Sequence, residues 1–319
     1  MKMRIEVALA TYNGFLYLEE LLKSLAKQTK FIDRIIVRDD NSSDNTMQIL
    51  LSYKNKGLPI TILPSNNKQL GILANFSLIL KHTSANYVFL CDQDDIWFPE
   101  KVEILIKKMT YLEQIYGKNI PLLVFSDMKI VNQKLAILSH SGMKYQGFHP
   151  DKFNTFKKAL LQNIVPGCSM VVNQSLLKLA LPIPQEAIMH DWWLVLVASA
   201  FGKISYINKP LFYYRQHPNN NIGASVWNIA SIISKIANFK VEPKLINDGF
   251  KEALMQAEKF YDIYGSILPK RHKSELEELL SIANKTFFNK YLSSIKLGLH
   301  KEGILRTLGF YVSLCARGG

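Results

Sequence analysis

Short apolar runs rich in β-branched residues alternate with amphipathic stretches through the first 125 residues of the chain. The runs lie at Arg4–Ala10, Ile35–Val37, Ile60–Leu63, Tyr87–Leu90 and Leu122–Phe125. Helical spacing of apolar residues separates them, at Phe15–Gln28, Asn45–Tyr53, Ile72–His82 and Lys101–Tyr116. This alternation predicts an α/β fold with a mainly parallel sheet that is covered by helices on both faces.

The pattern changes twice in the remainder of the chain. From about residue 150 to 222 it is mixed, with a helix near 152–162, an apolar strand at CSMVVN, two helical runs and the strand-like stretch KISYINKPLFYYRQ. Beyond about residue 225 we find only helical spacing, at 226–239, 245–264, 273–290 and 292–314. We therefore expect an α/β domain at residues 1–222 and a C-terminal helical region at residues 223–319.

Composition narrows the class of protein. The longest apolar stretch, WWLVLVASAFG, is shorter than the ~18 residues that a membrane span needs, so it is predicted to be a core helix. Cys91, Cys168 and Cys315 are widely spaced, which excludes a disulfide framework and a zinc site and indicates the reducing cytoplasm. The net charge of +13 indicates an anionic partner: a phosphorylated small molecule, an anionic membrane surface or nucleic acid. No nucleic-acid-binding motif is present, so nucleic acid is disfavoured.

Polar and acidic stretches follow three of the predicted strands: TYNG, DDNSSDNT and CDQDD. Ligands of open parallel sheets bind beyond the carboxyl ends of the strands, where these stretches would meet. Asp92 and Asp94 are two positions apart, so on extended chain their carboxylates point the same way and would suit Mg²⁺ or Mn²⁺ together with substrate phosphates. The alternative is a solvated acidic turn, with Asp95 capping the next helix. Three such stretches at one edge favour a binding site.

The other two stretches also have two interpretations. The carboxylates of DDNSSDNT would accept hydrogen bonds from a nucleobase or a ribose, and Tyr12 would stack on the base. Alternatively, these residues form turns, Ser42 or Ser43 caps the next helix, and Tyr12 packs.

In combination, ATYNG, RIIVRDDNSSDNT and YVFLCDQDDIWFPEKV resemble the nucleotide-sugar-binding half of family 2 glycosyltransferases, which have the GT-A fold. VPGCSMVVN, MHDWW and LFYYRQHPNNNIG extend the resemblance to rhamnosyltransferase-like members that build bacterial capsules, O-antigens and wall polysaccharides. The similarity covers residues 4 to about 222. The QxxRW motif of processive synthases is absent, which favours a single-addition enzyme.

The resemblance implies a role for each matching residue. The donor, a dTDP- or UDP-linked sugar with dTDP-L-rhamnose favoured, would be held by Thr11, Tyr12, Asn13, Asp39, Asp40, Asp92, Asp94, Asp95, Arg215 and His217. The metal, Mn²⁺ or Mg²⁺, would be bound by Asp94, Asp92 and His217, and Arg215 and His217 would add positive charge beside the diphosphate. Asp191 would be the catalytic base. The acceptor side would comprise Gly167, Cys168, His190 and Trp192, with His190 standing where the family more often has an acidic residue.

The implied reaction is inverting transfer to a glycan that grows on a lipid carrier at the inner face of the plasma membrane. The segments Ser225–Lys240 and Ser293–Arg317 carry an apolar face with basic flanks, which is typical of a helix lying in a membrane interface. Alternatively, these faces pack on the catalytic domain or form a homo-oligomer.

Two other functions compete with this interpretation. A nucleotidyltransferase would show an N-terminal glycine-rich phosphate loop bearing Lys or Arg, which TYNGFLYLEE lacks. A basic membrane- or nucleic-acid-binding protein would have little use for three acidic loops at one edge of its sheet.

Overall fold

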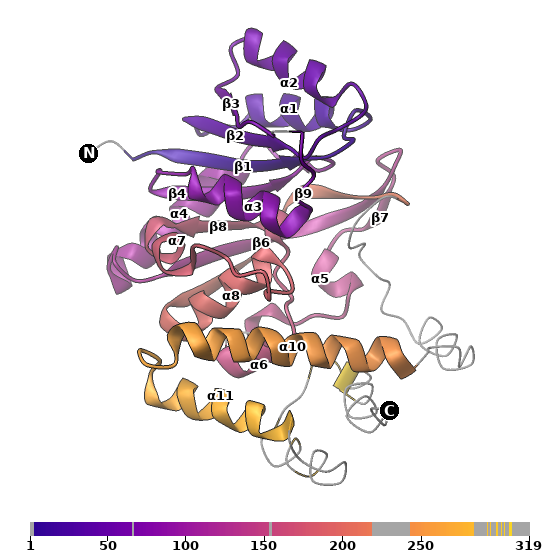
Figure 1. Ribbon diagram of the computed structural model, residues 1–319. Helices are drawn as coiled ribbons and strands as arrows, with labels where there is room; N and C mark the ends of the chain where they lie inside the picture. Colours follow the sequence, from indigo (N-terminus) through magenta and orange to yellow (C-terminus); the bar gives the residue numbers. More distant parts are fainter. Residues whose placement is uncertain are drawn as a thin grey trace.

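The computed structural model describes residues 3–65, 67–152, 155–218 and 243–283, together with residues 292, 294, 298, 301, 303, 306 and 307. Within these residues, nine strands form one sheet in the order β3-β2-β1-β4-β8-β6-β9-β5, and β7 pairs with β6 (Figure 1). The strands are β1 (Ile5–Thr11), β2 (Arg34–Asp39), β3 (Ile60–Ile62), β4 (Tyr87–Asp92), β5 (Ile96–Trp97), β6 (Leu122–Asn132), β7 (Ile137–Ser139), β8 (Met170–Asn173) and β9 (Lys203–Gln216).

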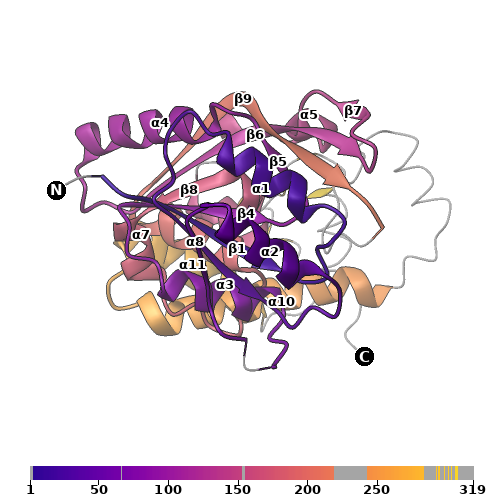
Figure 2. The ribbon, with the colours of Figure 1, turned by 90° about the horizontal axis from the view of Figure 1, so that it is seen from above.

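The helices alternate with the strands as the sequence pattern predicts. They are α1 (Leu18–Ala26), α2 (Thr46–Asn55), α3 (Ile72–Lys81), α4 (Lys101–Tyr116), α5 (Gly142–Tyr145), α6 (Phe156–Leu161), α7 (Gln174–Ala180), α8 (His190–Phe201), α10 (Pro243–Tyr264) and α11 (Lys270–Ala283), with 3-10 turns η1 (Pro150–Lys152) and η2 (Gly167–Ser169). Helix α4 packs on β6, β8 and β9, while α3 covers β1 and β2 from the other side (Figure 2). The predicted α/β class, with helices on both faces of the sheet, is confirmed.

Register brings the predicted site loops to one edge of the sheet. Strands β3, β2, β1 and β4 are parallel, β8 runs antiparallel to β4 and β6, and β9 is parallel to β6. Thr11 pairs with Asp39, and Ala10 pairs with Asp92, so β1, β2 and β4 end almost level with one another. The three polar stretches of the sequence therefore leave the sheet side by side.

The apolar run after residue 190 is a core helix, as predicted. Trp193 through Ala198 of α8 are buried, and the helix packs on α6, α7 and β9. The indole of Trp193 is fully buried and donates a hydrogen bond from Nε1 to the Ala180 carbonyl oxygen at 3.0 Å. A polar ring nitrogen in the core is thus partnered, as burial requires.

Helices α10 and α11 lie beneath the sheet and pack on each other and on α6 (Figure 1). The fully buried Phe260 of α10 contacts the rings of Phe156 and Trp193, each at 5.4 Å between centroids. The predicted helices at 245–264 and 273–290 correspond to α10 and α11 as far as residue 283; the stretch 226–239 and most of 292–314 lie outside the described residues. In the described part of the chain, no helix is both long and apolar enough to cross a membrane.

Candidate active site

A cleft of about 910 Å³ opens where β1, β2 and β4 end. It brings together twelve of the residues predicted from the sequence to form the site. These are Thr11, Tyr12, Asn13, Asp40, Asp92, Asp94, Gly167, Cys168, His190, Asp191, Trp192 and His217. The remaining three, Asp39, Asp95 and Arg215, do not line the cleft; they lie buried close behind residues that do.

Asp39 and Asp40 at the end of β2 are both buried and both bonded within the protein. Asp39 accepts hydrogen bonds from the Thr11 hydroxyl at 2.8 Å and from the backbone N–H and hydroxyl of Ser42 at 2.8 and 2.6 Å. Asp40 pairs with the guanidinium of Arg38 at 2.6 Å and accepts the N–H groups of Leu70 and Gly71, both at 2.8 Å. These contacts fix the β2 loop on one side and the segment before α3 on the other. A role of either carboxylate in holding the nucleoside stays a prediction.

Gln93, in the middle of the acidic turn, joins it to the loop after β1. Its side-chain oxygen accepts the Tyr12 N–H, and its amide nitrogen donates to the Tyr12 carbonyl oxygen, both at 2.8 Å. Gly14 passes so close that a Cβ there would meet Gln93 Oε1 at 2.3 Å. Asn13 adopts a positive φ of 48°, and its side-chain oxygen accepts the Ser43 N–H at 2.9 Å. Tyr12 is thereby held at the cleft with 45% of its surface exposed, free to cover a planar ligand.

Asp94 and His217 meet across the cleft although they lie 123 residues apart in the sequence. His217 Nε2 is 2.8 Å from Asp94 Oδ2, and both side chains are only slightly exposed. The ring of His217 also lies 4.8 Å from that of Tyr17. A carboxylate and an imidazole are both common metal ligands, and this contact brings the two together at the end of a strand.

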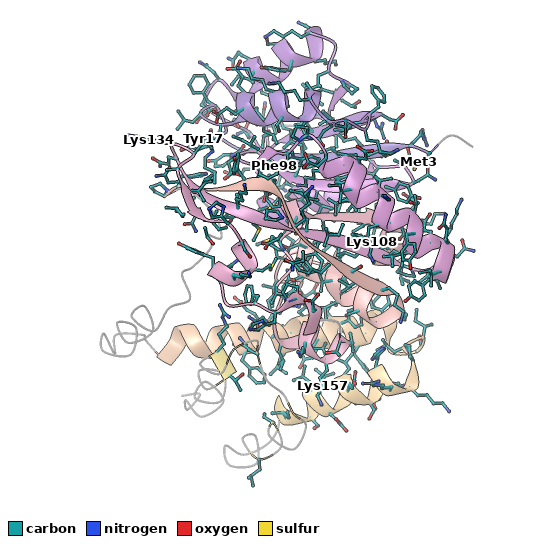
Figure 3. All side chains as sticks on the ribbon, turned by 180° about the vertical axis from the view of Figure 1, so that it is seen from behind. Met3, Tyr17, Phe98, Lys108, Lys134 and Lys157 are labelled. Carbon is teal, nitrogen blue, oxygen red and sulfur yellow. The ribbon has the colours of Figure 1, made fainter. Side chains whose placement is uncertain are left out.

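Arg215, which is buried and does not line the cleft, holds the backbone of the Asp94 turn. Its Nε donates to the Asp94 carbonyl oxygen at 3.1 Å and its Nη1 to the Gln133 carbonyl oxygen at 2.8 Å, while its Nη2 binds the carboxylate of Glu20. The guanidinium also lies over the Tyr17 ring at 4.6 Å. Figure 3 shows Tyr17 near Lys134, which follows Gln133, so the β6–β7 turn and the loop before α1 meet at this corner. Arg215 therefore shapes the Asp94 turn; direct contact with a diphosphate stays a prediction.

The acidic turn is electrostatically strained. Burial, with the neighbouring charges of Asp94 and Asp191, raises the pKa of Asp92 to about 7. Burial and the neighbouring charges of Asp94 and Asp92 raise the pKa of Asp95 well above its ordinary value, which the thiol of Cys168 partly opposes. Such a concentration of carboxylates is stabilised by a nearby cation.

These residues fit a hard divalent cation at the cleft side of the turn. Among the described residues, the tightest cluster of possible ligands is Asp92, Asp95 and Cys168, whose ligand atoms lie within 4.8 Å of one another. The thiol of Cys168 is a soft ligand, and Asp95 does not line the cleft, so this cluster suits Mn²⁺ or Mg²⁺ less well. Asp92, Asp94 and His217 line the cleft and offer oxygen and imidazole ligands, but they do not form such a close group; their role as the metal ligands stays a prediction.

Asp191 stands in the first turn of α8, opposite the acidic turn. Its Oδ1 accepts the Trp192 N–H at 2.6 Å, and its Oδ2 accepts the Gly167 N–H at 3.0 Å. Burial raises the pKa of Asp191 to about 6, and these hydrogen bonds partly oppose the rise. A carboxylate that is ionised near neutral pH and held by two backbone donors is well suited to take a proton from a substrate hydroxyl.

His190 and Trp192 flank Asp191. The imidazole of His190 is buried and stacked on Phe76 at 3.9 Å, and burial lowers its pKa to about 3. His190 is thus a neutral wall of the cleft, which explains how the position tolerates histidine beside the aspartate. Trp192 is held by a hydrogen bond from its Nε1 to the Ala159 carbonyl oxygen at 2.6 Å.

Three contributors to this site were not predicted from the sequence: Gln93, Tyr17 and Glu20. Gln93 lies inside CDQDD, where the carboxylates carried the signal. The roles of Tyr17 and Glu20 arise from contact with Arg215, almost 200 residues later in the chain. No local pattern announces such contacts.

The fold and the cleft are typical of a transferase: a mainly parallel sheet has an acidic turn at its carboxyl edge, and a partly buried carboxylate faces that turn. Residues 6–176 match the model of the glycosyl transferase family 2, and the chain belongs to that family. It is similar to the dTDP-rhamnosyl transferase RfbG of Shigella flexneri, with 33% identity over 227 residues, which are 68% of this chain and 74% of the relative. An uncharacterised glycosyltransferase of Rickettsia prowazekii, RP339, is 25% identical over 95% of this chain and 82% of its own length.

Solved structures show the same fold at low sequence identity. Residues 1–349 of S. aureus TarS in complex with UDP-GlcNAc match with a TM-score of 0.57 and 18% identity, over 98% of this chain and 79% of that one. The mannosyltransferase PcManGT from Pyrobaculum calidifontis, in complex with GDP-Man and Mn²⁺, matches with a TM-score of 0.53 and 15% identity, over 98% and 85% of the two chains. The family resemblance and the GT-A fold expected from the sequence are confirmed.

Proposed function

We propose that this glycosyltransferase transfers L-rhamnose from dTDP-L-rhamnose, with inversion at the anomeric carbon, to a growing bacterial surface glycan on a lipid carrier. The observation that carries the proposal is the placement of the Asp94–His217 pair and Asp191 in one cleft of a family 2 chain. The similarity to the dTDP-rhamnosyl transferase of Shigella flexneri supports rhamnose and the dTDP nucleotide. A UDP-hexose donor is the alternative.

In the proposed reaction, Tyr12 covers the base of the donor, and Asp92, Asp94 and His217 would hold the divalent cation. When bound, Mn²⁺ or Mg²⁺ would neutralise the charge that develops on the departing nucleoside diphosphate. Asp191 accepts the proton of the acceptor hydroxyl as its oxygen attacks the anomeric carbon from the face opposite the diphosphate. The bond to the diphosphate breaks in the same step, so no covalent enzyme intermediate is required. Trp192 and Gly167 keep the Asp191 carboxylate in place.

The test compares dTDP-L-rhamnose, UDP-glucose, UDP-GlcNAc and GDP-mannose, each with Mn²⁺ and with EDTA. We expect dTDP-L-rhamnose to give the largest rise in unfolding temperature and the fastest release of nucleoside diphosphate, both dependent on Mn²⁺. If the protein prefers a UDP sugar, the proposed donor is a UDP-hexose and not dTDP-L-rhamnose. No response to any nucleotide sugar would overturn the assignment of the cleft as a donor site.

A further inference from the structure

Lys101 is a fully buried cation that the proposed mechanism does not use. It is the first residue of α4, six positions after Asp95, and its side chain passes into the core. The Nζ atom lies 3.8 Å from the centroid of Trp97 and 4.0 Å from that of Phe212. Lysine is almost never fully buried unless it has partners, so these contacts require a reason.

The polar partner of Lys101 is the backbone of η2. Nζ donates a hydrogen bond of 2.6 Å to the Cys168 carbonyl oxygen. Gly167, one residue earlier in the same turn, donates its N–H to Asp191 Oδ2 at 3.0 Å. Two hydrogen bonds, which meet in the Gly167–Ser169 turn, therefore connect Lys101 to the carboxylate of Asp191.

This connection joins the two halves of the cleft. Lys101 follows the acidic turn at the end of β4, whereas η2 precedes β8 and carries the donor to Asp191. There is little slack at the junction: a Cβ on Gly167 would lie 3.0 Å from His190 Nε2 and 3.4 Å from Asp191 Cβ. A hydrogen bond from a charged donor is stronger than one from a neutral donor, and this ammonium is fully buried beside two aromatic rings.

We propose that Lys101 is a positioning residue, which locks the Gly167–Ser169 turn against the acidic turn and so holds the Asp191 carboxylate in register with the donor. It acts through the turn and touches no reacting atom. The turnover part of this proposal rests on the proposed glycosyl transfer, whereas the structural part does not.

The test compares Lys101→Met with Lys107→Met, which removes the same charge from the same helix at an exposed position. We expect amide hydrogen exchange of peptides covering residues 163–171 to be at least tenfold faster in Lys101→Met, with the β1 and β2 peptides unchanged. In Lys107→Met, exchange should equal that of the wild type. Unchanged exchange at 163–171, or faster exchange throughout the sheet, would overturn the proposal.

Turnover is the second readout, measured as Mn²⁺-dependent hydrolysis of the best nucleotide sugar. Lys101→Met should lower kcat at least tenfold and change KM for the donor much less, because the hydrogen bond of Lys101 runs to the Cys168 carbonyl oxygen on the Asp191 side of the cleft. If Lys101→Met has the wild-type kcat although its exchange is faster, Lys101 stabilises the turn without positioning Asp191 for catalysis, and the proposal is overturned.

Two controls keep the outcomes separable. The number of nucleotide sites per chain, determined by titration with dTDP, corrects kcat for misfolded protein. Should Lys101→Met fail to fold, Lys101→Gln replaces it, since its shorter side chain does not reach the Cys168 carbonyl; wild-type exchange in that variant would count against the proposal. If the wild type hydrolyses no nucleotide sugar, the proposed function fails while the exchange comparison still tests Lys101.

Discussion

Asp94 is the residue on which metal binding should depend most. Its carboxylate lies 2.8 Å from His217 Nε2 at the cleft, so substitution by alanine removes one member of this pair of proposed ligands. We expect Asp94→Ala to bind Mn²⁺ at least tenfold more weakly and to lose metal-dependent donor turnover, with its fold intact by circular dichroism. Asp262→Ala, at an exposed position of α10, is the matched control. Full activity of the wild-type protein after EDTA treatment would exclude a metal role for this site.

Asp191 should set the acid side of the pH profile. Because the proposed base must be ionised and burial raises its pKa to about 6, transfer at saturating donor and Mn²⁺, with the proposed metal ligand Asp92 kept ionised, should fall as pH decreases through 6. Asp191→Asn should bind donor and Mn²⁺ as the wild type does but lose transfer, because the base acts only on the acceptor proton. If the variant loses donor binding, Asp191 belongs to the donor site.

The same substitution has a consequence for stability, with a defined sign. The folded-state pKa of Asp191 lies above its unfolded value, so the ionised carboxylate destabilises the fold above about pH 6, and protonation relieves this below it. The difference of about two pH units corresponds to at most roughly 3 kcal/mol. Asp191→Asn loses one of the two backbone hydrogen bonds at every pH, so the sign of the burial cost appears in the pH dependence: the unfolding temperature of the variant minus that of the wild type should be larger at pH 8 than at pH 4. An equal difference at both pH values would contradict the assigned burial cost.

At the scale of elements, the β1 and β4 loops should act as one unit through Gln93. Gln93→Leu removes both hydrogen bonds to the Tyr12 backbone, each worth about 1 kcal/mol. We expect dTDP to bind roughly five- to thirtyfold more weakly, as measured by calorimetry, because Tyr12 is no longer fixed. Gln48→Leu, at an exposed position of α2, should bind as the wild type does. If Gln93→Leu and Gln48→Leu bind dTDP with the same affinity, Tyr12 is held by contacts other than those with Gln93.

The sequence predicts the long elements well and the short ones poorly. Helix α4 has the predicted bounds, Lys101–Tyr116, because its apolar residues recur over four turns. Strands β5 and β7 are two and three residues long and have no alternation to detect; they exist because β9 and β6 offer partners. Strand β6 continues from Phe125 to Asn132 through a polar stretch, since its pairing with β9 extends that far. The existence of β5 and β7 and the length of β6 therefore depend on pairing with strands that are distant in the sequence.

The residues of the site likewise fall into those that the sequence predicts and those that it does not. Asp92, Asp94 and Asp191 could be assigned from the sequence because their residue types and spacing carry chemistry. Their neighbours could not, since Gln93 acts on a backbone 81 residues away and Lys101 on one 67 residues away. A hydrogen bond to a distant carbonyl leaves no trace in the local pattern of either segment.

At the scale of the molecule, α10 should contribute to the stability of the α/β domain. Phe260 is fully buried among Phe156, Trp193 and Tyr264, so Phe260→Ala should lower the free energy of unfolding by about 3–5 kcal/mol in urea. Ile263→Ala, at a position that is 42% exposed on the same helix, should cost less than about 1 kcal/mol. Equal stability of the two variants would show that α10 is not part of the same cooperative unit.

Membrane association, predicted from the segment Ser225–Lys240, should be tested without removing α10. Cutting the chain after residue 222 would uncover the Phe156 and Trp193 rings and confuse binding with aggregation. We expect the full chain to sediment with anionic liposomes in a salt-sensitive manner, because each basic residue near the surface contributes roughly 1 kcal/mol. Charge reversal at Lys235 and Lys240 should weaken sedimentation, whereas reversal at Lys107 and Lys108 on α4 should not. Identical sedimentation of both variants would place these lysines away from the membrane.

The distance in sequence between Asp94 and His217 also bears on when the enzyme becomes able to act during its own synthesis. The two residues are 123 positions apart, so the nascent chain holds the acidic turn without its imidazole partner for the whole of that interval. At about 5–20 residues per second, the interval lasts roughly 6–25 seconds. During this time the first four strands can pair, but only half of the proposed donor site exists. The proposed donor site is thus completed late in synthesis, after most of the sheet has been made.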